Sequence, residues 1–457
     1  MEKKKDLFEL PVRKGILTLA IPMMLSGFLQ NAFSLVDMFF VGKLGTSSLA
    51  ALSISGFILG ILIIGISGIT TGTVTLIAHF KGKREDENAN MVIWQTIFLS
   101  LILWIFSIII GLFFTEKLLL LFGAKGDVVK KGNDYLKVSF LFSGVIFIFI
   151  SLNQALRGAG DAKTPLKILL ISNLLNVALD PFFIFGISFF PELGVTGSAI
   201  ATVISRFVGL VLTISILSKK SYYLKLSFHY FKILPKFINR ILKIGFFTSF
   251  QFFLRNLSLL FLTKIVSVFG AKGIASYGVG SRLRMVLMII IFGFSNASGV
   301  LVGQNMGAKN EEKAKMTLFE SLKICQLIIL PFELSLLLFA SFITGIFTKD
   351  AEIIRITPNF LRFQAVSFPF LATSILTNRS LTGAGDTAFP TIFVGLYTFF
   401  LRIILSYFLA IKTSYGINGI WLSIAITDVF MAISITLYFK TEKWKNIYYN
   451  HRQYLEN

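Results

Sequence analysis

The stretch that decides the fold occurs twice, as RGAGDAKTP at residues 157–165 and as TGAGDTAFP at residues 382–390. The two copies lie 225 residues apart. The same offset superposes the pairs Gly45 and Gly270, Ala50 and Ala275, Gly82 and Gly307, and Glu87 and Glu312. A single register held over that length indicates an internal duplication.

Composition places the duplicated chain in a membrane. Its 457 residues are 55% hydrophobic and 15% charged, and the mean hydropathy is +0.78. Soluble domains carry about 25% charged residues. At about 20 apolar residues per transmembrane helix, the hydrophobic content is enough for roughly twelve helices. We therefore predict a multi-pass protein of the cell membrane.

The net charge of +21 would indicate nucleic acid in a soluble protein. In a membrane protein it is expected from cytoplasmic loops that face anionic lipids, so no nucleic-acid partner is predicted. Cys325 is the single cysteine, which excludes an intramolecular disulfide. His79, His229 and His451 are too scattered for a metal centre. No cofactor is expected.

Apolar stretches separated by charged or Gly/Pro clusters predict an all-α fold of twelve transmembrane helices. The first six cover residues 15–42, 49–80, 90–115, 133–157, 164–188 and 194–218. The second six cover residues 241–268, 274–305, 314–346, 353–380, 389–411 and 416–439. The predicted domains are an N-terminal bundle at 1–218, a basic cytoplasmic linker at 219–240, a C-terminal bundle at 241–440 and a cytoplasmic tail at 441–457.

Lysine and arginine in the connections predict the orientation, because they are retained on the cytoplasmic side. They concentrate at the amino terminus and in the linker, so both termini are predicted to be cytoplasmic. Four lysines in residues 117–131 are the exception. Each repeat holds an even number of helices, which relates the halves by an axis along the membrane normal and suits alternating access.

Two carboxylates lie inside predicted helices of the first half: Asp37 in SLVDMFFVG and Asp180 in NLLNVALDPFF. An ionised carboxylate in hydrocarbon costs at least about 2.5 to 3.5 kcal/mol, which marks a functional site. Asn176 lies one turn deeper on the face of Asp180, and Thr202 lies at a similar depth on the next helix. Their oxygens suit Na⁺ and equally protons. A cationic substrate would compete with the ion for this negative charge.

Two further residues bear on this site. Pro22, fifteen residues before Asp37, removes a backbone hydrogen bond and is a candidate hinge of the first helix. Arg206 lies one turn below Thr202. If Arg206 pairs with Asp180, the site becomes a structural ion pair instead.

The second half differs at the equivalent positions, where Leu262, Leu401 and Leu405 replace Asp37, Asn176 and Asp180. Its helices carry Arg255, Lys264 and Arg402 with one central acid, Asp428. A structural Arg402–Asp428 pair is favoured over a second ion site.

The chain resembles the multidrug and toxic compound extrusion (MATE) transporters over essentially its whole length. The resemblance depends on LVDMFFVGKLG (35–45), RGAGDAKTP, TGAGDTAFP, NVALDPFFIFG (176–186) and GSAIATVISR (197–206). Acids in the first and fifth helices, with none in the seventh and eighth, resemble the DinF-like branch of this family.

The resemblance implies a V-shaped transporter, not an enzyme, that exports small lipophilic or cationic compounds in exchange for H⁺ or Na⁺. Carried over by motif, the ion-coupling site would consist of Asp37, Asn176, Asp180 and Thr202. Tyr135 is a possible member of this network, and Pro22 would be the bend of the first helix. The protein is expected to work as a monomer among membrane lipids.

Two other functions were weighed. A flippase for a lipid-linked oligosaccharide, from the same superfamily, would use a cationic cavity, which Arg255 and Arg402 favour. An intramembrane transferase would need paired aspartates or a histidine with a nearby acid. Asp161 and Asp386 instead stand alone in turns, where capping is the ordinary role. The choice between H⁺ and Na⁺ and the physiological substrate stay open at this point.

Overall fold

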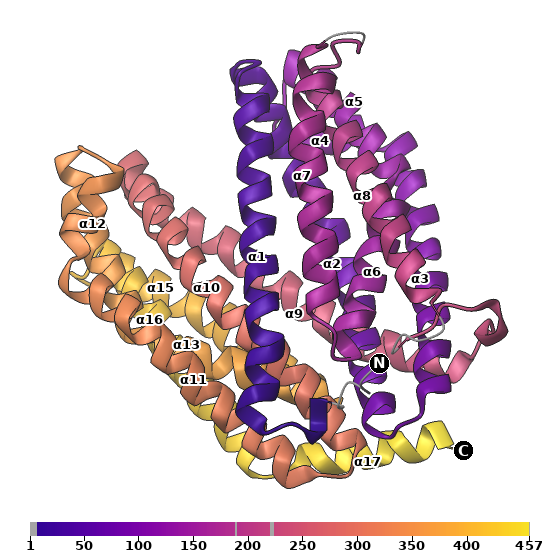
Figure 1. Ribbon diagram of the computed structural model, residues 1–457. Helices are drawn as coiled ribbons and strands as arrows, with labels where there is room; N and C mark the ends of the chain where they lie inside the picture. The colour runs from indigo at the N-terminus through magenta and orange to yellow at the C-terminus, as the bar shows by residue number, and fades with distance from the viewer. Residues whose placement is uncertain (1–6, 188–189, 220–223, 457) are drawn as a thin grey trace. The chain divides into compact units, whose positions relative to one another are not determined.

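The structure is a computed structural model that describes residues 7–187, 190–219 and 224–456 (Figure 1). Residues 220–223 of the predicted linker and the first lysines of the chain lie outside the described residues. Within the described ranges every regular element is helical, which confirms the all-α fold class.

The helices of the first half are η1 (Leu7–Glu9), α1 (Val12–Gly42), α2 (Thr46–Gly82), α3 (Asp86–Phe113), α4 (Thr115–Leu121), α5 (Asp127–Leu141), α6 (Ser143–Gly158), α7 (Lys163–Phe185) and α8 (Val195–Leu217). After η2 (Phe228–Tyr230) come α9 (Pro235–Ser267), α10 (Gly270–Gly307), α11 (Glu311–Leu338), α12 (Ala340–Phe347), α13 (Ala351–Ala384), α14 (Ala388–Phe393), the π-helical η3 (Val394–Leu401), α15 (Arg402–Ile411), α16 (Ile417–Lys440) and α17 (Lys443–Glu456).

Among the described residues, eleven helical segments are long and apolar enough to cross a membrane, and the bent pair α5 and α6 makes a twelfth if it counts as one span. The predicted single helix at 133–157 is wrong in one respect, because the chain bends by 51° between α5 and α6. The indole of Trp104 donates to the Leu141 carbonyl (2.8 Å), and the Val145 N–H turns to the Phe142 carbonyl (3.1 Å). A side chain inserted into the backbone ladder is a known cause of such kinks.

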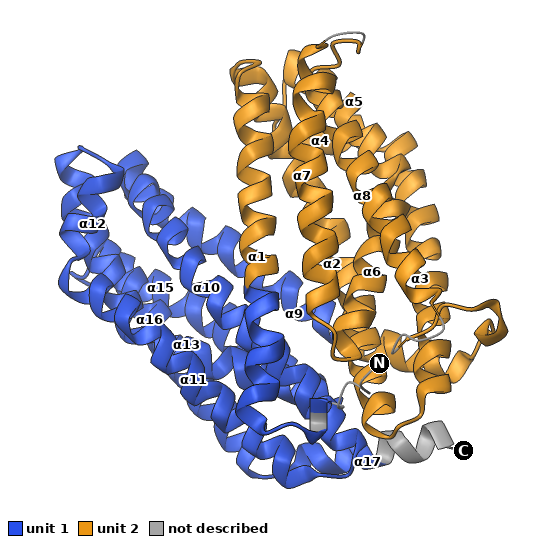
Figure 2. Ribbon diagram, viewed as in Figure 1, with its two compact units in different colours: residues 1–24, 247–457 blue, residues 25–246 orange. Residues whose placement is uncertain are grey.

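The chain forms two compact units (Figure 2). The N-terminal unit comprises residues 25–246, and the C-terminal unit comprises residues 1–24 and 247–457. The start of α1 therefore groups with the second repeat, and the start of α9 groups with the first. The predicted lobes, 1–218 and 241–440, did not anticipate this exchange of helix ends.

Glycines explain how the exchanged ends pack within each unit. In the N-terminal unit, a Cβ on Gly72 would lie 2.5 Å from the Ile241 carbonyl oxygen, and one on Gly245 would lie 2.8 Å from the Gly68 carbonyl oxygen. In the C-terminal unit, a Cβ on Gly293 would lie 2.1 Å from the Met24 side chain. Only a residue without a side chain permits such close approach.

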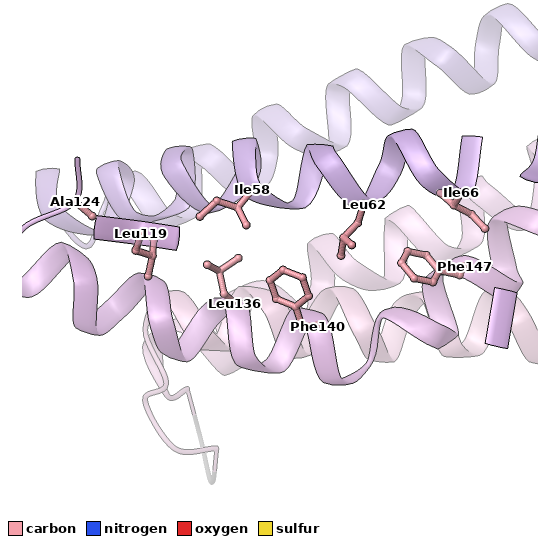
Figure 3. Packing of buried hydrophobic residues seen from close by; sticks show 8 residues of the cluster. All are labelled: Ile58, Leu62, Ile66, Leu119, Ala124, Leu136, Phe140 and Phe147. Atoms are coloured by element: carbon pink, nitrogen blue, oxygen red, sulfur yellow. The ribbon is translucent and has the colours of Figure 1, made fainter. Parts of the chain in front are cut away.

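The N-terminal unit has an apolar cluster between α2 and the helices from α4 to α6 (Figure 3). Its buried members are Ile58, Leu62, Ile66, Leu119, Ala124, Leu136, Phe140 and Phe147. These side chains point toward one another in Figure 3, so the bent α5–α6 segment is held on α2 by ordinary dispersion contacts.

The linker is attached to α3 in its described part. The Asn90 side chain accepts from the Lys225 N–H (2.8 Å), and the Gln95 side chain bonds the backbone of Lys232 and Leu234. Trp94 packs between two linker aromatics, Phe228 and Phe231.

In the C-terminal unit, α10 and α13 approach backbone to backbone. A Cβ on Gly383 would lie 2.0 Å from the Gly299 carbonyl oxygen, and the hydroxyls of Ser298 and Ser380 are 2.8 Å apart.

We expect Gly383→Ala to force these helices apart and to destabilise the protein by about 1 to 3 kcal/mol. Thermal unfolding in detergent would measure this. Gly278→Ala on α10 meets no atom within 4 Å and should leave the transition unchanged. Equal stability of the two variants would contradict the close packing.

Candidate functional site

The N-terminal unit brings together the four polar residues that the sequence predicted. Asp180 and Asn176 lie on α7 and are fully buried, while Asp37 on α1 and Thr202 on α8 are partly buried. Three helices therefore contribute to one site inside one compact unit.

The Asn176 side-chain amide connects the site. When its nitrogen faces the carboxylates, the orientation that satisfies both ends of the amide, it donates to Asp37 Oδ1 (3.1 Å) and to Asp180 Oδ2 (3.2 Å). Its oxygen then accepts from the Thr202 backbone N–H (3.1 Å) and from the Thr202 hydroxyl (3.3 Å). One amide thus holds two carboxylates and a hydroxyl in fixed positions.

One oxygen of this site has no partner. With both carboxylates ionised, Asp180 Oδ1 is buried and accepts no hydrogen bond from any described residue. A buried acceptor that is left unsatisfied is costly, and such groups in native proteins call for an explanation. Two carboxylates that share one neutral amide also repel each other in a low-dielectric interior. A proton or a small cation would satisfy the free oxygen and reduce the repulsion.

Local features of α7 and α8 position these residues. A Cβ on Gly197 would lie 2.2 Å from the Phe183 carbonyl oxygen, so only glycine lets α8 come this close to α7. The contact places Thr202, further along α8, beside Asn176. Asn173 also donates to the Leu29 carbonyl on α1 (3.1 Å). The sequence analysis missed Asn173, although NLLN (173–176) puts it nearly one turn before Asn176 on α7.

Arg206 does not form the ion pair that was the alternative for this site. Its guanidinium lies over the Phe33 ring (4.9 Å to the centroid) and the Phe149 ring (5.6 Å), and it reaches the Ser172 hydroxyl at 3.5 Å. No carboxylate of a described residue lies within 4.0 Å of it. Aromatic faces stabilise the buried cation, and the negative charge of Asp37 and Asp180 is not cancelled by direct contact.

Tyr135 and Pro22 lie outside the hydrogen-bonded set. Tyr135 packs on the apolar cluster of Val41, Ile184 and Val195, one turn beyond the two carboxylates, and no hydrogen bond joins it to Asp37, Asn176, Asp180 or Thr202. Pro22 lies inside α1, fifteen residues before Asp37. The boundary between the compact units follows Met24, two residues after Pro22.

The second repeat has an ion pair where the sequence predicted one. Arg402 donates to Asp428 and, through Nε, to the Thr427 hydroxyl at 2.9 Å, and Asp428 is 1% exposed. The preference for a structural pair at Asp428 is confirmed. Among the described residues there is also no group of three or more His, Cys, Asp or Glu side chains arranged to hold a metal ion.

Comparison with known proteins agrees with this architecture. The family model MatE matches the chain twice, over residues 22–182 and 248–408. The "Probable multidrug resistance protein NorM" of Thermotoga maritima is 27% identical over 441 residues, which cover 95% of this chain and 93% of that protein. The "FAD transporter" of Shewanella oneidensis is 26% identical and covers 95% and 96%.

A solved structure described as "Crystal structure of MATE in the bent conformation" superposes with a TM-score of 0.90 at 27% identity, over 97% of this chain and 98% of that one. The matched halves of the family model coincide with the internal repeat, and the relatives are named as transporters and resistance proteins. The chain therefore belongs to the MatE family of multidrug and toxic compound extrusion (MATE) transporters.

Proposed function

We propose that this protein is a secondary active multidrug efflux transporter that exports lipophilic or cationic compounds in exchange for H⁺ or Na⁺ by alternating access. The observation that carries the proposal is the Asp37–Asn176–Asp180 arrangement, with an unsatisfied carboxylate oxygen inside the N-terminal unit. The names of the relatives support multidrug export as the kind of transport.

Charge competition is the proposed coupling mechanism. Two neighbouring carboxylates in a membrane interior are unstable when both are ionised and uncompensated. A bound proton, a sodium ion or a cationic substrate each relieves that instability, and each does so at the same place. Binding of the ion therefore displaces the substrate, and binding of the substrate displaces the ion. A gradient of the ion then drives export of the substrate.

Arg206 matters because of what it does not contact. Its guanidinium lies on two aromatic rings, so the nearest buried cation does not occupy the carboxylates. Carboxylate, amide and hydroxyl oxygens are the hard ligands that Na⁺ accepts, and the same carboxylates accept protons. We assign Asp37, Asn176, Asp180 and Thr202 as the ion-coupling site for either ion. We propose that Tyr135 borders the ion-coupling site on its apolar side, where Tyr135 packs on Val41, Ile184 and Val195.

The hinge role of Pro22 rests on the division between the units. Its ring has no N–H to donate within α1, and the unit boundary follows two residues later. Asp37 lies on the portion of α1 that belongs to the N-terminal unit. A change of angle at Pro22 would therefore move the start of α1 relative to a site residue on the same helix.

The remaining proposals follow from sequence. From the acids in the first and fifth predicted helices we infer that the chain belongs to the DinF-like branch. From the lysine-rich connections we infer that both termini are cytoplasmic and that the helices lie in the cell membrane, and a monomer among lipids is the proposed working form. The flippase alternative is weakened, because Arg402 is paired with Asp428 and is not available to bind an anionic substrate.

We expect Asp37→Asn and Asp180→Asn each to abolish export of a fluorescent lipophilic cation, because a neutral amide cannot exchange a cation for a proton or Na⁺. The measurement is dye accumulation in cells that express equal amounts of each variant. Glu87→Gln removes an exposed carboxylate of the same unit and serves as the matched control. Normal export by both aspartate variants would refute the coupling site. Imposed pH or Na⁺ gradients in proteoliposomes would then identify the ion.

Pro22→Ala should restore the missing hydrogen bond, stabilise a straight α1 and reduce the rate of export several-fold. Binding of the lipophilic cation to purified protein should persist, because Asp37 and Asp180 are unchanged. Pro331→Ala, in the interior of α11, is the control for loss of a helix proline far from the unit boundary in the chain. Export by Pro22→Ala at the unmodified rate would remove the hinge from the mechanism.

A further inference from the structure

The C-terminal unit contains a polar cavity whose charge is opposite to that of the coupling site. The cavity has a volume of about 50 Å³ and lies between α9, α10 and α13. Two arginines line it, together with two amides and an apolar wall; the principal residues are Arg255, Arg379, Gln251, Asn378, Phe252 and Phe292. No carboxylate lines it.

Neither arginine is neutralised. Arg255 makes no ion pair or hydrogen bond with any described residue, and the contact found for Arg379 is with the face of the Phe252 ring, at 5.8 Å. Both arginine residues are only partly exposed. A cation inside a membrane protein is costly unless it is paired or serves a function. These two arginines therefore need a counter-charge that the protein does not supply.

The surrounding charges increase this need. Arg255 lies within electrostatic range of Arg284, Arg379 and Arg402, and Asp428 is the acid within that range. Asp428 is already bonded to Arg402. The interior of this unit thus carries surplus positive charge around the cavity. An anion that enters the cavity would gain the attraction of Arg255 and Arg379 without displacing an existing partner.

The amide residues of the wall are held in place. Asn378 donates to the Gln251 side-chain oxygen (3.0 Å), and Gln251 donates to the Thr391 hydroxyl (2.9 Å). Arg379 is positioned by the close contact of α13 with α10, where a Cβ on Gly299 would lie 2.8 Å from the Arg379 carbonyl oxygen. The polar side of the cavity is therefore pre-organised, which lowers the cost of binding.

The repeat shows that this charge is particular to the second half. At the 225-residue offset, Arg255 corresponds to Gln30 and Arg379 to Gln154. Both first-half counterparts are neutral amides of similar length. The duplicated scaffold accommodates an uncharged side chain at these positions, so the fold itself does not require the arginines.

We propose that the C-terminal unit binds an anionic head group, a carboxylate or a phosphate monoester of an amphiphilic molecule, between Arg255 and Arg379. A water molecule needs at least about 10 to 15 Å³, so the cavity of about 50 Å³ has room for a few waters or for one small head group. Phe252, Phe292 and Ile375 offer an apolar surface for the adjoining chain. The guanidinium fork is the preferred partner of both kinds of oxyanion. With this site the protein would bind anionic amphiphiles in addition to cations. The proposal does not depend on the coupling site.

The test is binding of dodecyl phosphate to the purified full-length protein in nanodiscs of neutral phosphatidylcholine, measured by isothermal titration calorimetry. We expect Arg255→Gln and Arg379→Gln each to weaken binding at least about tenfold, as loss of a charge-assisted hydrogen bond would. Arg255→Lys and Arg379→Lys keep the charge and should retain part of the affinity. Arg355→Gln, whose side chain on α13 is 78% exposed, is the matched control. Thermal unfolding of each variant checks that it is folded.

Three outcomes would overturn the proposal: no binding of dodecyl phosphate, equal binding by the folded glutamine variants, or equal binding of dodecyl trimethylammonium at the same site. Nanodiscs that contain phosphatidic acid, a lipid with a phosphate monoester, distinguish the source of the head group. Competition by that lipid would identify a lipid phosphate as the natural occupant, and undiminished binding would identify a free amphiphile. Asp37→Asn should bind dodecyl phosphate normally, so failure of this site and failure of the coupling site are separate results.

Discussion

The amide of Asn176 is the interaction on which the N-terminal site depends. It is the only kind of neutral side chain that can donate to two carboxylates and accept from a hydroxyl at once, and here it does so across three helices. A leucine at this point, as in the second repeat, would leave Asp37 and Asp180 without a shared donor. A cation there would instead fix the charge of the pair. The neutral amide positions the carboxylates and leaves their charge available.

Much of the architecture was accessible from sequence because it depends on local composition and on a repeat. Hydrophobic length predicts the helices, and the 225-residue register predicts two similar halves. Asp37, Asn176, Asp180 and Thr202 were found because polar groups at one depth in a membrane are rare. Arg402 and Asp428 were paired for the same reason, and the structure confirms that pair.

What the sequence did not indicate depends on tertiary contacts. The break between α5 and α6 requires Trp104 from α3 to take the Leu141 carbonyl, which no local pattern shows. The position of Arg206 on Phe33 and Phe149 depends on rings from two other helices. The grouping of the start of α1 with residues of the second repeat likewise depends on where Gly293 leaves room for Met24.

The two halves share a similar backbone, but their buried acidic and basic residues lie at different positions. Gly194 and Gly416 each precede the last predicted transmembrane helix of their half, with φ values of +56° and +55°. Aligned on these glycines, Arg206 corresponds to Asp428. The first half therefore has acids on α1 and α7 with an arginine on α8, and the second has an arginine on α15 with its acid on α16. Duplication gave two equivalent interiors, and substitution at a few positions gave them opposite electrostatic character.

The exchange of helix ends also has a consequence for how the protein is made. Residues 7–24 are synthesised well before the rest of the unit in which they pack, because its other members begin at residue 247. The first unit, in turn, is incomplete until residue 246 has been synthesised. Neither repeat contains all the residues of one compact unit. If the gene were cut within the linker, the first fragment would lack the start of α9, and the second fragment would lack the start of α1.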